Sequence, residues 1–245
     1  MNSKLIITFL KHIMANNDRQ WFQAHKDEYL EAKASFEEGV AEAIARIAEF
    51  DPSIAHVQVK DATYRFYRDT RFSNDKSPYK NHLGAYIAAH GKKALHGGYY
   101  LHMEPGHCLL ALGNYYLPTN ILTSCRNEIM GNIDRWREAV ESPDFLHTFG
   151  KPGEGGWDDE RGFGMTMLKK CPKDFPKDYP YMDYLRMKDY CCWTRVADNF
   201  FGQRRLARRD DPHLQDRQAH DGYDERGDRR LRIRNKENNY GNNKI

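Results

Sequence analysis

A run of cationic residues between positions 64 and 87 is the part of this sequence whose residue types and spacing best suit binding chemistry. Five cations fall within sixteen residues, interleaved with aromatic side chains; they are Arg65, Arg68, Arg71, Lys76 and Lys80. Two acids in the same window, Asp69 and Asp75, offset them only in part. Guanidinium forks bind phosphate and carboxylate oxygens in pairs, and lysines add point charges. The run therefore predicts a site for an anion, and phosphate above all.

Turn-forming residues explain how such a site would be built. Ser73, Asn74 and Asp75, followed by Ser77-Pro78, favour turns that expose backbone N–H groups beside the guanidinium groups. The predicted anion site comprises Arg65, Arg68, Asp69, Arg71, Asp75, Lys76, Tyr79 and Lys80. We expect the arginines to face a common pocket, with Asp69 orienting one of them. The alternative is that the arginines pair with acids and only hold the fold together.

Histidines form a second group with possible chemistry. His82, His96, His102 and His107 lie in or near expected strands, and Glu104 lies between the last two. A metal site needs ligands that converge, and none of the familiar helical ligand spacings occurs here. The sequence therefore predicts no metal ligand and no tightly bound zinc. It contains no P-loop, dinucleotide fingerprint or nucleophile elbow either, so reaction, catalytic residues and cofactor stay unknown.

The elements that must position these residues follow from hydrophobic spacing. Apolar residues at helical spacing predict a helix over 4–15, and Asp18 is placed to cap a second helix from about 20 to 50. Strands are expected at 64–68 and 83–88, a hairpin at 99–103 and 108–113, and a helix at 119–141. The prediction is an α+β fold: one domain over 1–202, with a mostly antiparallel sheet packed with an N-terminal helix pair and a central amphipathic helix.

The remaining residues, 203–245, differ in composition. They hold 12 of the 38 Lys and Arg residues and 8 of the 35 Asp and Glu residues, and almost no Ile, Leu, Val or Phe. Such a segment cannot bury enough apolar surface to offset the entropy lost on ordering. We predict a disordered, low-complexity tail.

The sequence also indicates the cellular compartment of the protein. Five cysteines, without a CxxC pair or a secretion signal, predict reduced thiols. The apolar run 5–10 is too short for a signal-peptide core or a membrane span. The prediction is a soluble, cytoplasmic protein with no membrane partner; the sequence leaves its oligomeric state open.

Several of these motifs together resemble the DUF2461 family, a domain of unknown function. They are the Asn16-Asn17 turn before Trp21-Phe22, then Arg65, the segment RDTRFSNDKSPYK (68–80), GGYYLHMEP (97–105), and Gly113 and Pro118 before Arg126. The resemblance covers roughly 5–195 and implies signature positions only: Arg65, Arg68, Asp69, Arg71, Phe72, Asp75, Lys76, Pro78, Tyr79 and Lys80. Family members usually continue past Phe200-Phe201 into an amphipathic helix, so the tail indicates either a changed reading frame or an accessory segment.

Three functions remain open from the sequence. The first is a binding module, or an enzyme of undetermined reaction, that acts on a phosphorylated small molecule or nucleotide through the Arg/Lys segment. The second, less favoured, is nucleic-acid binding by the same cations with Tyr64, Phe66 or Tyr67 as stacking surfaces. The third is a structural or interaction domain in which the arginine network only stabilises the fold.

The predicted disorder of the tail can be tested directly. Limited proteolysis should remove residues from about 205 onward early and leave a resistant core, because unpacked backbone is cleaved first. Protection of this segment in hydrogen exchange would contradict the prediction.

Overall fold

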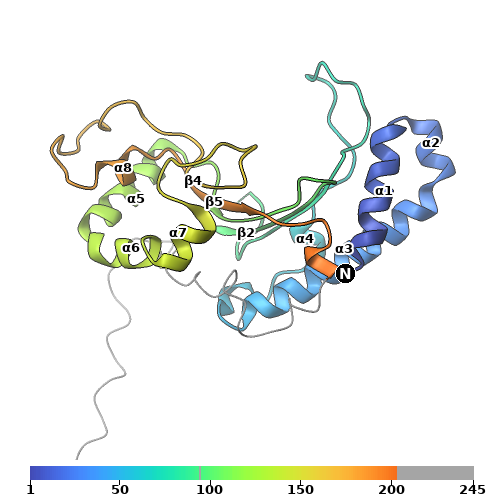
Figure 1. Ribbon diagram of the computed structural model, residues 1–245, viewed down its shortest axis with the longest axis horizontal. Helices are drawn as coiled ribbons and strands as arrows, with labels where there is room; N and C mark the ends of the chain where they lie inside the picture. The colour runs from blue at the N-terminus through green and yellow to red at the C-terminus, as the bar shows by residue number, and fades with distance from the viewer. Residues whose placement is uncertain (94, 203–245) are drawn as a thin grey trace, which may run out of the picture.

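The computed structural model describes residues 1–93 and 95–202 (Figure 1). The predicted tail, 203–245, lies outside the described residues. Within the described ranges the chain forms eight α-helices and one five-stranded antiparallel sheet, which confirms the α+β prediction. The helices are α1 (Ser3–Ala15), α2 (Arg19–Ala24), α3 (Lys26–Ala48), α4 (Val59–Ala62), α5 (Thr119–Gly131), α6 (Ile133–Val140), α7 (Pro143–Phe149) and α8 (Met182–Arg186). No helix in these ranges is both long and apolar enough to cross a membrane.

The N-terminal helices begin where the sequence predicts. The backbone N–H of Trp21 donates to the Asp18 side chain at 2.8 Å, so Asp18 is the expected cap. The prediction of one helix from about 20 to 50 is wrong, because the helix is interrupted at His25, between α2 and α3. The ring nitrogen Nδ1 of His25 lies 2.8 Å from the Trp21 carbonyl, and its ring stacks on the indole at 4.0 Å. The same carbonyl also accepts from the His25 backbone N–H at 3.1 Å, which closes the last turn of α2.

The five strands are β1 (Leu83–Ile87), β2 (Gly98–Met103), β3 (Leu109–Asn114), β4 (Arg161–Phe163) and β5 (Tyr190–Arg195). Their order in the sheet is β1-β2-β3-β5-β4, with every neighbouring pair antiparallel. The predicted β2–β3 hairpin and the β1 strand are confirmed. The predicted strand at 64–68 is wrong: the segment makes only the isolated bridges Thr63↔Ala85 and Tyr67↔Tyr79 and otherwise runs as loop.

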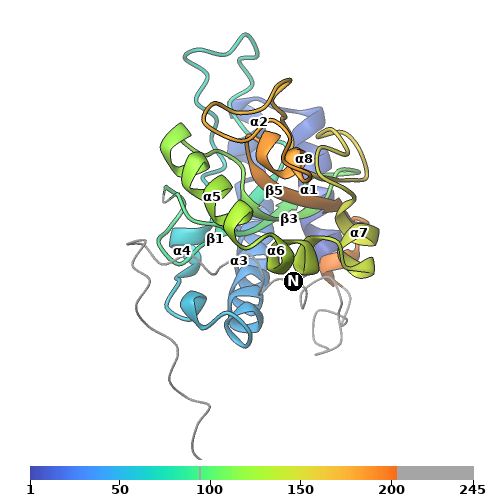
Figure 2. The same cartoon turned by 90° about the vertical axis from the view of Figure 1, so that its left-hand side faces the viewer.

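One face of the sheet builds the main core. In β2 this face carries Tyr99, Leu101 and Met103, all buried with residues of α1 and α3. Figure 1 shows α1–α4 gathered near one end of the sheet and α5–α8 near the other, and Figure 2 shows the same groups after a quarter turn. Apolar residues of both groups join one continuous cluster, which fits a single domain.

The central helix predicted over 119–141 is likewise divided. It ends at Gly131, and α6 starts at Ile133, with Asn132 between them at φ −129° and ψ 41°. The Asn132 amide donates to the Glu128 side chain at 2.6 Å. The break lets Trp136 of α6 meet Tyr190 of β5 edge to face, with ring centroids 5.6 Å apart.

The opposite face of the sheet holds a smaller apolar cluster. Leu109 and Ala111 of β3 pack there with Cys191 and Trp193 of β5. Trp193 is fully buried against Gly162 of the neighbouring strand β4. A Cβ atom at position 162 would lie 2.1 Å from Cζ2 of the indole, so the ring can occupy its place only over a glycine.

We expect Gly162→Ala to lower the free energy of unfolding by about 1–3 kcal/mol, the usual cost of overpacking a core. Gly131→Ala is the matched control, since among the described residues nothing lies within 4 Å of the added methyl group. Alanine in a helix is favoured over glycine by roughly 0.5–1 kcal/mol, so this variant should be slightly more stable. Urea denaturation measures both; equal stability of the two variants would refute the packing argument.

Candidate ligand cavity and histidine cluster

The arginines of the predicted anion site are held by acids of their own loop. The guanidinium of Arg71 donates to both oxygens of Asp69, with Nε and Nη2 at 2.9 and 2.7 Å. Arg65 lies 4.0 Å from the same carboxylate, and Arg68 binds Asp75. Each guanidinium therefore already faces a carboxylate, and the three gather around two acids instead of one open pocket.

The remaining members of the predicted site are spread over the same segment. Figure 1 shows a cyan loop between α4 and β1 that projects from the body near α1. The side chains of Arg65 and Arg71 are 71% and 76% exposed. Lys76 donates to the Thr70 carbonyl at 2.9 Å. Tyr79 is a core residue: its ring stacks on Phe22 at 4.1 Å.

Arg68 borders a different feature. With Arg19, Gln23 and Tyr67 it lines a small hollow of about 260 Å³ beside α2. Arg65 and Arg71 are not among the residues that line this hollow. The hollow thus takes in only part of the predicted anion site.

Hydrogen bonds within the loop lower the pKa of both carboxyl groups. The hydrogen bonds from Arg71 lower the pKa of Asp69 below its ordinary value. The pKa of Asp75 is also lowered, first by hydrogen bonds from the Ser77 side chain and backbone and then by Arg68. Both carboxylates therefore stay charged well into the acidic range.

A larger cavity lies over the second face of the sheet, close to the point where the cationic loop begins. Its volume is about 730 Å³, and residues of the strands and of several loops line it. The aromatic residues that line it are Tyr64, Tyr86, Tyr100, Tyr115, Tyr116 and Trp157. Lys92, Lys93 and Asn114 add polar groups. A cleft of this size with several aromatic walls and few polar groups is typical of small-molecule sites.

Two ammonium groups flank one of these rings. The Nζ atoms of Lys80 and Lys92 lie 5.4 and 5.5 Å from the ring centroid of Tyr64. Lys92 also donates to the Thr63 carbonyl at 2.6 Å. Burial lowers the pKa of both lysines, and for Lys80 the nearby Arg65 adds to this effect. The nearby charge of Asp61 partly offsets this effect for Lys92. An anion bound here would favour the charged forms of both lysines.

A row of hydrogen-bonded side chains forms part of the cavity floor and continues beyond it. Tyr100, His102 and Glu104 are spaced two residues apart, so those in β2 share one face. The Tyr100 hydroxyl lies 2.8 Å from His102 Nδ1, and His102 Nε2 lies 3.0 Å from Glu104 Oε2. Gly84 on β1 makes room, because a Cβ there would come 2.9 Å from the Tyr100 hydroxyl.

The electrostatics of this row follow from burial and pairing. The hydrogen bond from His102 lowers the pKa of Glu104, and the Asn81 amide donates to its other oxygen. Burial raises the pKa of Tyr100, so its hydroxyl keeps the proton at neutral pH. The hydrogen bonds therefore connect an ionised carboxylate, through the His102 ring, to a protonated phenol at the cavity floor, and each bond polarises the next.

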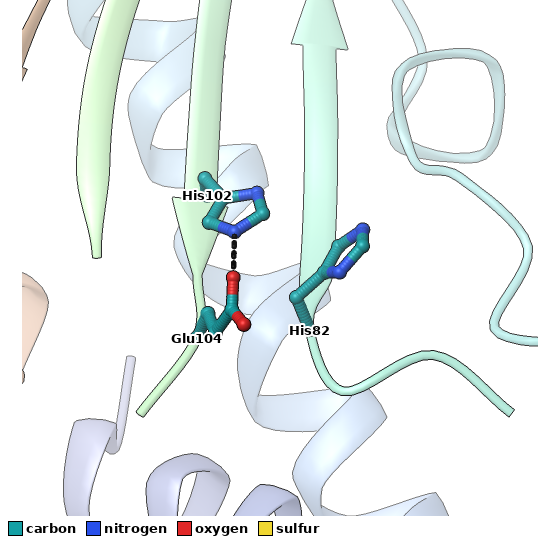
Figure 3. A group of neighbouring side chains, drawn as sticks. All are labelled: His82, His102 and Glu104. Atoms are coloured by element: carbon teal, nitrogen blue, oxygen red, sulfur yellow. Dashed lines mark hydrogen bonds and ion pairs between the residues drawn. The ribbon is translucent and has the colours of Figure 1, made fainter. Parts of the chain in front are cut away.

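His82 joins this row from the neighbouring segment. Its ring stacks on His102 with centroids 4.5 Å apart, and its Nδ1 lies 3.0 Å from Asn81 Oδ1. Burial, then the charges of His102 and Lys80, lower its pKa to about 4, so the imidazole is neutral at pH 7. Figure 3 shows His82, His102 and Glu104 lying together, and one ligand atom from each lies within 4.8 Å of the others.

Sequence reasoning missed this cluster. It considered His102 with His107 across the hairpin turn, but His107 is exposed and lies outside the group. The partner is His82, because the register that pairs Gly84 with His102 places residue 82 beside residue 104. The alternation of β2 already signalled a shared face for 102 and 104, whereas the contribution of His82 depends on register.

Comparisons with known proteins identify the family of this chain. A family model described as a conserved hypothetical protein (DUF2461) matches residues 5–216, which includes the loop, the cavity and the histidine cluster. No curated protein and no solved structure matches the chain.

The loop ion pairs lead to a pH prediction. Because the pKa of Asp69 is lower in the folded loop, the Asp69–Arg71 pair stabilises the loop above the ordinary carboxyl pKa and is lost as the pH falls through the lowered value. Arg71→Gln should raise the pKa of Asp69 in a carboxyl NMR titration. Arg65→Gln, which removes a partner at 4.0 Å, should raise it less. An unchanged Asp69 pKa in Arg71→Gln would contradict the pairing.

Proposed function

The chain belongs to the DUF2461 family, and because that description names no ligand, we propose a function from the geometry of this chain. It binds a phosphorylated small molecule that carries a planar ring, such as a nucleotide, in the cavity over the second face of the sheet. The observation that carries the proposal is the ring of Tyr64, which lines the cavity and has the ammonium groups of Lys80 and Lys92 over it.

Two kinds of contact favour this ligand class. A planar base can stack on the tyrosine and tryptophan rings of the cavity wall, and base stacking on an aromatic side chain contributes about 1–3 kcal/mol. A phosphate beside Lys80 and Lys92 would gain charge-assisted hydrogen bonds of roughly 1.5–3 kcal/mol each. The volume of about 730 Å³ falls within the usual range for small-molecule sites.

The cationic loop contributes its two ends to this site. Tyr64 precedes and Lys80 ends the cationic run. The Tyr64 N–H donates to the Gly84 carbonyl of β1 at 3.0 Å. The Lys80 N–H donates to the Phe66 carbonyl at 3.0 Å. The arginines between them keep a net positive charge after pairing with Asp69 and Asp75. That charge would draw an anion toward the cavity without contacting it. We place the protein in the cytoplasm on the cysteine pattern, and leave any reaction unassigned.

One observation supports nucleic acid as a second candidate ligand. Phe72 at the loop is 95% exposed and lies beside Arg71, whose guanidinium carbon is 5.8 Å from the ring centroid. An exposed ring with a neighbouring cation is a stacking surface for single-stranded bases. This contact would use the outer part of the loop instead of the cavity.

Nucleotide titration by calorimetry tests the first proposal. We expect AMP, ADP or ATP to bind, with inorganic phosphate binding more weakly because it has no ring. Tyr64→Ala should weaken binding roughly 2- to 30-fold, because it removes the ring over which Lys80 and Lys92 are held. Lys92→Gln should weaken it roughly 10- to 100-fold, while its amide can still donate to the Thr63 carbonyl.

Arg68→Lys is the matched control, because it changes the loop but not the cavity. It should bind nucleotide like the unmutated protein. The reverse pattern, with Arg68→Lys weakened and Tyr64→Ala unaffected, would move the anion site to the loop. A preference for single-stranded oligonucleotides that is lost in Phe72→Ala would favour the second candidate. Absence of any binding by nucleotides would refute the cavity proposal.

A further inference from the structure

We propose that His82, His102 and Glu104 bind one divalent transition-metal ion, with Zn²⁺ the representative. This inference goes beyond ligand binding in the cavity, and it replaces the sequence-based expectation that the chain has no metal ligand. The three residues come from the end of β2 and from the residue before β1, and they lie together in Figure 3.

The donor set and its spacing fit such an ion. Two imidazoles and one carboxylate are ligands that zinc and its first-row neighbours share. The three ligand atoms lie within 4.8 Å of one another. Atoms bound to one ion at roughly 2.0–2.2 Å are at most about 4.4 Å apart, so the three ligand atoms must approach slightly. The stacked rings of His82 and His102 must also rotate so that one lone pair of each points at the ion.

The surroundings supply the supporting contacts that metal-binding histidines need. The side chain of His102 is 6% exposed, and its Nδ1 faces the Tyr100 hydroxyl at 2.8 Å. Asn81 contacts both other ligands, with its oxygen 3.0 Å from His82 and its nitrogen donating to Glu104. Partners of this kind fix ring orientation and tautomer.

Metal binding would change the tautomer of His102. Without an ion, the Tyr100 O–H donates to Nδ1 and the Nε2–H donates to Glu104, which accounts for both short contacts. With an ion on Nε2, the ring proton moves to Nδ1 and donates to the Tyr100 oxygen. The number of protons is unchanged, and Tyr100 keeps its hydroxyl hydrogen, which turns away from His102 toward the cavity that Tyr100 lines. Metal site and cavity are thereby linked through one side chain.

The same arrangement leaves part of the coordination shell for a further ligand. Three protein ligands are the number found in zinc sites that keep an open position, whereas closed structural sites use four. Glu104 and His82 are both partly exposed, so an ion can enter from solvent. The structure thus favours an exchangeable, accessible ion over a buried structural one.

Equilibrium dialysis of the full chain, stripped with chelator, tests the proposal. We expect about one Zn²⁺ per chain and no comparable uptake of Mg²⁺, which prefers oxygen ligands. His82→Gln and Glu104→Gln should each weaken Zn²⁺ binding by 10-fold or more, and Co²⁺ substitution should give a visible spectrum that both variants lose. His107→Gln is the matched control from the same hairpin and should bind like the unmutated protein.

Tyr100→Phe tests the positioning role of the hydroxyl. It should keep one Zn²⁺ per chain and the Co²⁺ spectrum while weakening affinity roughly 10-fold, the lower end for loss of such a supporting contact. If His102→Gln fails to fold because it is buried, the partly exposed His82 and Glu104 variants still decide the matter. Zn²⁺ bound equally by the unmutated protein, His82→Gln and Glu104→Gln would place the ion elsewhere and overturn the proposal. No nucleotide is used, so this result is separate from that of the cavity.

Discussion

The register of the β1–β2–β3 ladder is the constraint on which the rest of the structure depends. It pairs Gly84 with His102 and His102 with Leu109. Side chains alternate across a strand, so this register sends Leu101 and Met103 into the helix-covered core and leaves Tyr100 and His102 on the other face. A slip by one residue would bury the imidazole under α3 and expose the leucine, which the core cannot tolerate. Apolar burial on one face therefore positions the polar row on the other.

The cationic side chains of the loop and those near the cavity have different neighbours. In the loop, Asp69 pairs with a guanidinium that is largely exposed and Asp75 with one that is part-buried, and exposed ion pairs contribute little to stability. Near the cavity, Lys80 and Lys92 lose hydration by burial and have an aromatic ring as a neighbour. A cation that has lost part of its hydration is stabilised by a ligand of opposite charge. This contrast is why we assign the ligand to the cavity and a steering role to the loop.

The histidine cluster and the cavity share Tyr100 but use different chemistry. The cavity wall offers stacking surfaces and point charges, whereas the cluster offers nitrogen and carboxylate lone pairs. Gly84 permits both, because its missing side chain leaves space for the Tyr100 hydroxyl above β1. A ligand and an ion could then influence each other through the proton shared between Tyr100 and His102, without any movement of the backbone.

The sequence by itself determined the features that rest on neighbouring residues. Helix α1, the Asp18 cap, strand β1 and the β2–β3 hairpin depend on spacing and turn chemistry within a few positions. The cationic run also begins beside the cavity, since Tyr64 lines it and Lys80 lies near the Tyr64 ring.

Tertiary structure decided what depends on distant partners. The alternating pattern at 64–68 predicted a strand, yet Phe66 is buried among Phe9, Phe22 and Tyr79 of other segments. Strand β5 gave no alternation to detect, because Tyr190 through Trp193 are buried on both faces of the sheet. His82 meets Glu104 only through strand register, and Lys92 reaches Tyr64 only through the packing of a loop onto the sheet. Local spacing encodes caps and turns, but the convergence of side chains far apart in sequence is fixed by which faces the core must bury.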